Sequence, residues 1–339
     1  MKIVIICGGV GTKMWPESQP TSPKHFLPLL NGKSIFELGW EGLRKKYSPD
    51  EIFLQTNQVQ AEIAMRLVPE IIKENIFIEP EMRNHGPATG FAAAQLIKRG
   101  LGDEPFILVQ ADVLREPADK FNEMIEEMNK LALNTDKYIT GGIVPSSIVR
   151  GVDYLVKGNL VTEEGGIKIY EVADYIDRSE EEKIKQYLGS DKLLLHANHT
   201  SMTPNNLLKM YQQSKPEWQQ ASLAIANGAN EIEEYAKMPK GGIEEATIPM
   251  YKNGGALVVE LPFEWIDFGT WESVAKYLGD QNENKIEVEA GNNFVRSKKK
   301  VAIIGLNDLV VIDSPEGVLV CPKSMSGRVG EVPKILENM

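Results

Sequence analysis

The opening strand and the glycines that end it constrain the fold of this chain more than any other feature. Lys2–Cys7 is a continuous, mostly β-branched apolar run, which is typical of a strand buried on both faces. Gly8 and Gly9 follow it at once. Similar short apolar runs then alternate with patterns of helical period. This alternation predicts βαβ units, and so an α/β fold with a Rossmann-like mixed, mostly parallel sheet flanked by helices.

Ligands of such sheets bind at the carboxyl ends of the strands, so residues 8–16, here called the first loop, are the first place to look for a site. The expected strands are Lys2–Cys7, Ile52–Leu54, Phe106–Gln110, Tyr138–Val144 and Leu257–Leu261. The expected helices are Ser34–Lys45, Val59–Val68, Ala88–Arg99, Asp119–Leu131 and Ser179–Tyr187.

A different pattern begins around Gly279. Short apolar runs are separated there by turn clusters, which predicts an all-β appendage of about sixty residues. The expected strands are Ile286–Glu289, Val301–Ile304, Leu309–Ile312 and Val318–Cys321. We therefore divide the chain into a domain of residues 1–280 and a small C-terminal β domain of residues 281–339, with the boundary near residues 278–290.

The net charge limits the classes of partner. The chain has 37 Lys and Arg against 48 Asp and Glu, a net charge of −11, so a nucleic acid is not expected as its main partner. Its two cysteines give neither metal spacing nor a disulfide framework, and we expect Cys7 to be buried and reduced. The opening apolar run is too short for a signal peptide, and no stretch approaches a membrane span. We expect a cytoplasmic protein without a membrane partner.

The first loop has the composition of a phosphate-binding turn. Gly8, Gly9 and Gly11 let backbone N–H groups turn toward one anion, and Lys13 and Lys24 add positive charge. A nucleoside triphosphate fits this pattern. From the glycines alone, a strand-ending turn beside surface lysines is an equal alternative. The Walker A and G-x-G-x-x-G motifs are absent, which disfavours a dehydrogenase, and no hydrolase triad is visible.

Asp112 directly follows the apolar run Phe106–Gln110. An aspartate at the carboxyl end of a strand, opposite a phosphate loop, suits Mg²⁺ held by one or two carboxylates plus substrate phosphates. The alternative is a turn or helix-capping aspartate.

The wider string GGVGTKMWPESQPTSPKHF, residues 8–26, closely resembles a motif of the sugar-nucleotide pyrophosphorylase family, in its mannose-1-phosphate guanylyltransferase branch. That branch has G-G-x-G-[ST]-[RK]-[LM]-W-P-x-S followed by P-K-[QH]-F. The resemblance implies that Gly8, Gly9, Gly11 and Thr12 lie against the nucleotide. It also implies that Lys13, where arginine is usual, and Lys24 neutralise the triphosphate.

Two later segments extend the resemblance on the nucleotide side. Residues 79–88 are similar to E-P-x-x-R-N-T-A-P-A, which implies that Glu79, Arg83 and Asn84 lie by the base and ribose. Asn84 is also expected to cap the following helix. Asp112 is retained from the family's P-A-D-H. Residues 265–271 match W-x-D-x-G-[ST]-W, which implies that Asp267 is the second carboxylate on the metal.

The motifs on the sugar side have drifted. Asp153 stands where the family's G-Y-G-Y-I has its second glycine, and an aspartate there narrows or re-aims the sugar pocket. The resemblance implies a sugar-phosphate site made of Gly151, Asp177, Arg178 and Asn198. In it, Asp177 accepts sugar hydroxyls and Arg178 lies beside the phosphate. The alternative for residues 177–182 is a helix start capped by Ser179.

His196 and His199 lie in the same drifted region, three residues apart. This spacing could suggest a metal, but no third ligand of matching type is present. We interpret them as sugar-pocket or surface residues.

The resemblance implies that the chain makes GDP-mannose and pyrophosphate from GTP and mannose 1-phosphate by direct attack on the α-phosphate. It also implies Mg²⁺ as the cofactor and the catalytic residues Lys13, Lys24, Asp112 and Asp267. The C-terminal β segment resembles a part that often joins subunits, so a homodimer is expected. Two alternatives stay open: the same chemistry on another sugar 1-phosphate, and a regulatory paralogue that binds nucleotide sugars with weak catalysis or none.

Overall fold

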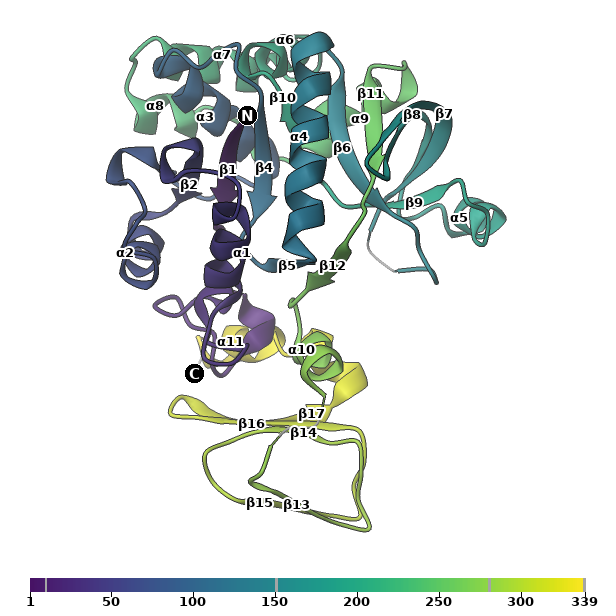
Figure 1. Ribbon diagram of the computed structural model, residues 1–339. Helices are drawn as coiled ribbons and strands as arrows, with labels where there is room; N and C mark the ends of the chain where they lie inside the picture. Colours follow the sequence, from purple (N-terminus) through teal and green to yellow (C-terminus); the bar gives the residue numbers. More distant parts are fainter. Residues whose placement is uncertain (10, 150–151, 280–281, 338–339) are drawn as a thin grey trace.

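The computed structural model describes residues 1–9, 11–149, 152–279 and 282–337. Within these residues, one large mixed sheet carries helices on both faces, and a small β unit lies beyond one end of it (Figure 1). The expected boundary between residues 280 and 281 falls outside the described part of the chain.

The large sheet has ten described strands. In sheet order they are β11 (Ala256–Glu260), β8 (Ile167–Ile176), β7 (Tyr154–Glu164), β9 (Leu193–His196), β6 (Tyr138–Ile143), β10 (Ser201–Met202), β4 (Phe106–Gln110), β1 (Lys2–Ile6), β2 (Ile52–Thr56) and β3 (Ile76–Ile78). The neighbours β4, β1, β2 and β3 are parallel, as the alternating pattern predicts. The strands β7, β8, β9 and β10 pair antiparallel, so the antiparallel share of the sheet is larger than that pattern indicates.

Helices cover both faces because the central strands are apolar on both. Side chains alternate between the two faces of a strand. Val4 of β1 therefore belongs to one core cluster, whereas Ile3 and Ile5 belong to another. The first cluster is covered by α3 (His85–Lys98), α6 (Pro204–Ser214), α7 (Pro216–Ala226), α8 (Glu231–Ala236) and α9 (Glu244–Lys252). The second is covered by α1 (Ile35–Arg44), α2 (Gln58–Leu67) and α4 (Ala118–Asn134).

Three smaller sheets complete the described strands. β5 (Val113–Glu116) pairs with β12 (Glu264–Asp267), β13 (Lys285–Val288) with β15 (Val301–Ile304), and β16 (Leu309–Ser314) with β14 (Phe294–Arg296) and β17 (Gly317–Pro322). The remaining helices are α5 (Glu181–Tyr187), α10 (Trp271–Leu278), α11 (Glu331–Leu336) and the 3₁₀ turns η1 (Thr12–Met14), η2 (Lys24–Phe26), η3 (Pro49–Glu51), η4 (Lys73–Asn75) and η5 (Lys323–Arg328). The C-terminal segment is therefore β-rich, as expected, with a short helix at its end.

The small β unit packs against the first loop through a shared apolar cluster. Met14 of the loop, Trp271 of α10 and Phe294 of β14 all belong to it. A hydrogen bond from Trp271 Nε1 to the Trp15 carbonyl, at 2.9 Å, fastens the loop to α10. The loop thus has the large sheet on one side and the C-terminal unit on the other.

Candidate functional site

The carboxyl ends of the parallel strands bring the predicted nucleotide-side residues to one edge of the sheet. Gly8 follows β1, Glu79 follows β3 and Asp112 follows β4, and these three strands lie in the parallel part of the sheet. This is the edge at which ligands of open α/β sheets bind.

A two-stranded ribbon joins the two predicted carboxylates across more than 150 residues of sequence. β5 begins directly after Asp112, and its first residue, Val113, pairs with Asp267, the last residue of antiparallel β12. The ribbon therefore places Asp112 beside Asp267, and this pairing depends on backbone register rather than on side-chain flexibility.

Lys24 lies between the two carboxylates. Its Nζ is 2.7 Å from Asp112 Oδ2 and 3.9 Å from Asp267 Oδ1. Burial alone would lower the pKa of Lys24, but the two neighbouring carboxylates outweigh it and raise this pKa above its ordinary value. One ammonium thus lies beside two acids.

The two carboxylates respond in opposite directions to this arrangement. Burial acts to raise the pKa of Asp112, but its close contact with Lys24 lowers that pKa overall. Partial desolvation, together with the like charge of Asp112, raises the pKa of Asp267 despite the more distant Lys24. Asp112 is therefore the carboxylate held firmly in its charged form, and Asp267 is the one that a further cation would stabilise most.

The glycines of the first loop differ in what they make room for. Gly11 has φ +79°, and a Cβ there would lie 2.5 Å from the Lys24 side chain, so glycine is required for the lysine to reach the acids. A Cβ added at Gly8 or Gly9 would meet no neighbouring atom within 4 Å, and both residues are exposed. This open backbone is where an anionic ligand could approach.

Two further predicted loop residues line the same opening. Lys13 is exposed and acts on the carboxylate of Asp267 as a neighbouring positive charge. Thr12 is exposed and lies close to Gly330 of the C-terminal unit. A Cβ added at Gly330 would lie 3.1 Å from the Thr12 Oγ1.

Sequence reasoning missed two buried side chains that support the loop and the Asp112 turn. Gln60 of α2 contacts His25 Nε2 at 3.1 Å and donates to the Gly9 carbonyl at 3.4 Å. Arg115 donates to the carbonyls of Gln110 and Val113 at 3.2 and 3.0 Å, beneath Asp112. Burial lowers the pKa of Arg115 to about 9. Neither residue stands in a motif, so no sequence signal marked them.

The predicted base and ribose residues lie on one segment but are held differently. Glu79 accepts a 2.6 Å hydrogen bond from Tyr235, and burial raises its pKa. Arg83 pairs with Glu81 at 2.7 Å. Asn84 precedes α3 with φ +68° and makes no side-chain capping bond, so the expected capping role is wrong: its positive φ takes the side chain out of capping geometry. Asn84 is exposed instead.

Gly86, one of the departures from the resembling motif, has a packing reason. A Cβ at this position would overlap the Trp218 ring, which is fully buried. The family's alanine is therefore excluded by a tryptophan from α7, and the change follows from packing rather than from ligand contact.

On the sugar side, Arg178 forms an ion pair with Asp153. The guanidinium donates from Nε at 2.9 Å and from NH2 at 2.6 Å to the Asp153 carboxylate, which is 3% exposed. Although burial acts to raise it, the pKa of Asp153 is lowered by these bonds. The aspartate that stands in place of the motif's glycine thus pairs with the cation that the resemblance places beside the sugar phosphate.

Asp177 holds a turn before α5. Its Oδ1 accepts from the Ser179 amide at 2.9 Å and from Ser179 Oγ at 2.5 Å, bonds that lower its pKa. The N-cap of α5 is Glu180, not Ser179 as the alternative interpretation had it, because the serine hydroxyl is engaged by Asp177. Gly151, the remaining predicted glycine, lies outside the described residues.

Asn198 carries an acceptor with no partner. Its Oδ1 is buried and makes no hydrogen bond, whereas Nδ2 lies 3.5 Å from Glu244 Oε1. Its backbone carbonyl accepts from Gln110 Nε2 at 3.0 Å, so Gln110 links this segment to the Asp112 turn. An unpaired buried acceptor of this kind suits a ligand hydroxyl. Glu244 was absent from the predicted site although it lies beside Asn198.

His196 and His199 are buried, so their interpretation as surface residues is wrong. His196 Nε2 contacts the hydroxyls of Thr140 and Tyr251, each at 3.0 Å, and burial lowers its pKa to about 4. His199 Nε2 lies 3.4 Å from Arg115 Nε, and burial together with this positive charge lowers its pKa as well. Within the described part of the chain, no group of three or more His, Cys, Asp or Glu is arranged to hold a metal ion.

Comparisons with known families agree with the two-part architecture. Residues 2–151 match the nucleotidyl transferase family, and residues 283–336 match the mannose-phosphate isomerase and GMP-like β-helix domain. A mannose-1-phosphate guanylyltransferase of Klebsiella pneumoniae is 26% identical over 352 residues, covering 99% of this chain and 74% of that protein. A protein of the same name from Escherichia coli gives the same identity and coverage.

A solved structure confirms the fold over the whole length. The crystal structure of a protein named mannose-1-phosphate geranyltransferase, from Thermus thermophilus, superposes with a TM-score of 0.86 at 24% identity, covering 99% of both chains. The α/β fold with a small C-terminal β domain is therefore that of a known structure. Among the helices of the described residues, none is long and apolar enough to cross a membrane.

Proposed function

We propose a function from the premise that this chain is a diverged member of the sugar-nucleotide pyrophosphorylase family, in the branch of the mannose-1-phosphate guanylyltransferases. It transfers the guanylyl group of GTP to mannose 1-phosphate, giving GDP-mannose and pyrophosphate. The observation that carries this proposal is the cluster in which Lys24 bridges Asp112 and Asp267 beside an open glycine loop.

In the proposed reaction, a phosphate oxygen of the sugar 1-phosphate forms a bond to the α-phosphorus of GTP. The bond from that phosphorus to the oxygen bridging to the β-phosphate breaks, and its electron pair leaves with pyrophosphate. The nucleophile is already an anion, so the chain has no proton to remove. Its work is to align the two substrates and to neutralise their charge.

Each catalytic side chain has a place in this reaction. Lys24 and the exposed Lys13 would share their donors with the triphosphate and stabilise the departing pyrophosphate. Gly8, Gly9, Gly11 and Thr12 would lie against the nucleotide, with Glu79, Arg83 and Asn84 farther along its base and ribose. On the sugar side, Asp177 and the unpaired oxygen of Asn198 would accept hydroxyls.

The donor set at the cluster fits Mg²⁺. Two carboxylates lie beside one ammonium there, and carboxylates plus substrate phosphates are the usual ligands of this ion. Asp112 and Asp267 would hold it. When bound, Mg²⁺ supplies charge neutralisation at the reacting phosphates.

A second candidate keeps the chemistry and changes the sugar. The Asp153–Arg178 ion pair favours it, because Asp153 stands where the resembling motif has glycine and so changes the shape of the sugar side. A regulatory paralogue without catalysis is less well supported, because both carboxylates and Lys24 are present and in contact.

Release of pyrophosphate from GTP and Mg²⁺ with mannose 1-phosphate tests the main proposal. A panel of other hexose and heptose 1-phosphates, and of ATP and UTP, separates the candidates. Turnover highest with GTP and mannose 1-phosphate is expected. Preference for another sugar supports the second candidate, and no turnover with any pair contradicts both.

We further propose that the enzyme acts in the cytosol and that the C-terminal unit, divided from the rest near residue 280, joins two copies of the chain. The outward face of its β13–β15 ribbon supports this association. Ile286, Val288 and Ile304 are 48, 50 and 69% exposed on paired strands. Sedimentation of the full chain, with and without Ile304→Lys, tests the homodimer.

A further inference from the structure

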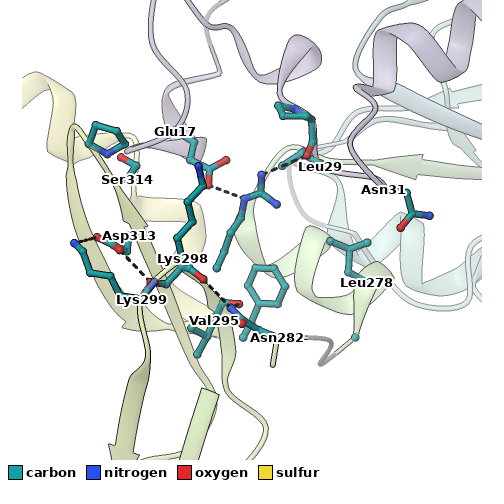
Figure 2. Close-up of a pocket in the computed structure, with 16 residues that line it drawn as sticks. Glu17, Leu29, Asn31, Leu278, Asn282, Val295, Lys298, Lys299, Asp313 and Ser314 are labelled. Carbon is teal, nitrogen blue, oxygen red and sulfur yellow. Dashed lines mark hydrogen bonds and ion pairs between the residues drawn. The ribbon is translucent and has the colours of Figure 1, made fainter. Parts of the chain in front are cut away.

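A second cavity lies between the two units, away from the carboxylate cluster. It has a volume of about 810 Å³ and is lined from both sides (Figure 2). Glu17 and Leu29 come from the segment after the first loop, and Phe294, Arg296 and Lys298 come from β14 and the turn that follows it. Small-molecule sites range over about 300–1,000 Å³, so this interdomain cavity has the size of a metabolite site.

The charge of the interdomain cavity is positive in an acidic protein. Its lining has three cations, Arg296, Lys298 and Lys299, and two carboxylates, Glu17 and Asp313. Lys299 is 3.1 Å from Asp313, and Arg296 is 2.6 Å from Glu17. Lys298 is exposed and has no ion-pair partner among the described residues. In Figure 2 its side chain runs toward Glu17.

Lys298 can therefore bind a ligand without losing an ion pair, and Arg296 can exchange its contact with Glu17 for a contact with the ligand. Arg296 is held by Glu17, a partly buried carboxylate, and its NH2 also lies 3.4 Å from the Pro28 carbonyl. A phosphate dianion offers more charge and more acceptors than one carboxylate, and arginine binds it with the same planar fork. The apolar part of a ligand would lie against Leu29, Leu278 and Phe294.

A ligand bound in the interdomain cavity would affect how the first loop is held. Glu17 lies two residues after Trp15, whose carbonyl is held by Trp271, and four residues after Lys13. If a ligand takes Arg296 from Glu17, the segment that carries Thr12 and Lys13 loses a polar attachment to the C-terminal half of the chain and keeps the Trp271–Trp15 hydrogen bond.

We propose that the interdomain cavity binds a small phosphorylated metabolite, held by Lys298 and Arg296, and that this binding releases Glu17 and so regulates nucleotide binding at the first loop. The regulatory part rests on the function proposed above. The binding part does not.

Calorimetric titration of the full chain tests the binding. The probes are glucose 6-phosphate and uridine monophosphate, which carry the same phosphate group on a sugar and on a nucleoside. We expect at least one to bind saturably, with Lys298→Glu and Lys298→Ala weakening it, the charge reversal by about tenfold or more. Glu17→Gln should tighten it several-fold, because Arg296 is then free. Lys252→Glu, the same charge change at an exposed lysine of α9, is the control and should change nothing.

Saturation by neither probe below about 10 mM, or equal affinity in the wild-type and Lys298→Glu proteins, would overturn the proposal. The better of the two probes shows whether the ligand is a sugar phosphate or a nucleotide. The KM for GTP, measured with and without the probe, then tests regulation: it should shift in the wild type and not in Lys298→Glu. If the chain binds the probe but releases no pyrophosphate, the binding site is supported and the proposed function is contradicted. A chain with the opposite result keeps the function and loses the site.

Discussion

The nucleotide side and the sugar side of the candidate site both contain a cation facing a carboxylate, but the two clusters are balanced differently. Lys24 serves Asp112 at 2.7 Å and Asp267 at 3.9 Å, so two acids share one ammonium. Arg178 instead gives two hydrogen bonds to one buried acid, Asp153. The first group has two negative charges beside one positive charge, whereas the second has one of each.

This difference indicates where divergence has been tolerated. An unbalanced cluster needs a partner, and polyphosphate with a divalent cation supplies the matching charge. A balanced ion pair needs none, so it fixes the shape of the sugar side without committing it to an anion. The nucleotide side would then retain the chemistry of the family while the sugar side sets which acceptor is used.

The strongest test of the nucleotide side is Asp112→Ala. It should lower kcat by roughly 10²–10³-fold or more, comparable to the loss of one preorganised charge-stabilising group, about 3–4 kcal/mol. The measurement is pyrophosphate release at saturating GTP, with circular dichroism to follow the fold. Because Asp112 lies at the surface end of a strand, the fold should stay intact.

Asp191→Ala, a substitution at an exposed aspartate remote from the loop in sequence, is the matched control and should keep full activity. Near-normal kcat in Asp112→Ala would remove the carboxylate cluster from the mechanism and leave the two sides of the site without the contrast drawn here.

The pH dependence of the unfolding free energy compares how well water is excluded from the nucleotide side and from the sugar side. Burial lowers the pKa of His25, beneath the nucleotide side, and of His196, beneath the sugar side, to about 4 each. The unfolded chain takes up these protons near pH 6.5, earlier than the folded one. The stability they support is therefore complete above pH 6.5 and falls as the pH drops toward 4, by about 2–3 kcal/mol for each histidine.

Urea unfolding at pH 7.5 and 4.5 measures this loss. His25→Gln and His196→Gln should each reduce the difference in unfolding free energy between the two pH values by a similar amount. A smaller reduction in His196→Gln would mean that water reaches the sugar side, and no reduction in either would contradict the burial of both rings.

Features that depend on residues close together in the sequence could be predicted, whereas features that depend on residues far apart could not. The parallel strands β1 and β4 were predicted because an apolar run and its flanking turn are local signals. The antiparallel strand β7 has a long exposed stretch, and β8 mixes buried and half-buried residues, so neither gives a continuous apolar run. The approach of Asp112 and Asp267 to the same lysine rests on β5–β12 register, which only the family resemblance could anticipate. The Asp153–Arg178 pair joins two departures from the family, so neither the resemblance nor local pattern could show it.

The glycines of the first loop separate structural from ligand-binding roles. Gly11→Ala must adopt φ +79° and displace the Lys24 stem, so it should cost about 1–3 kcal/mol of stability and lower kcat with it. Gly8→Ala meets nothing within 4 Å, so stability should be unchanged while the KM for GTP rises. Thermal unfolding and steady-state kinetics of both variants give the comparison. Equal loss of stability in the two would show that the loop is packed rather than open.

The smallest expected effect addresses the sugar side. Asp153→Gly removes the carboxylate that pairs with Arg178, and the arginine is half exposed and can stay hydrated, so the fold should survive. Without the opposing charge of Asp153, the Arg178 guanidinium should lower the KM for a sugar 1-phosphate by about tenfold, the worth of one charge-assisted hydrogen bond, with little change in kcat. Asp153→Gly with Arg178→Lys restores the glycine of the resembling motif and keeps a positive charge at position 178, and it should move preference toward mannose 1-phosphate. If neither variant changes the KM of any sugar, the ion pair is a structural brace, and acceptor choice must be sought around Asn198 and Glu244 instead.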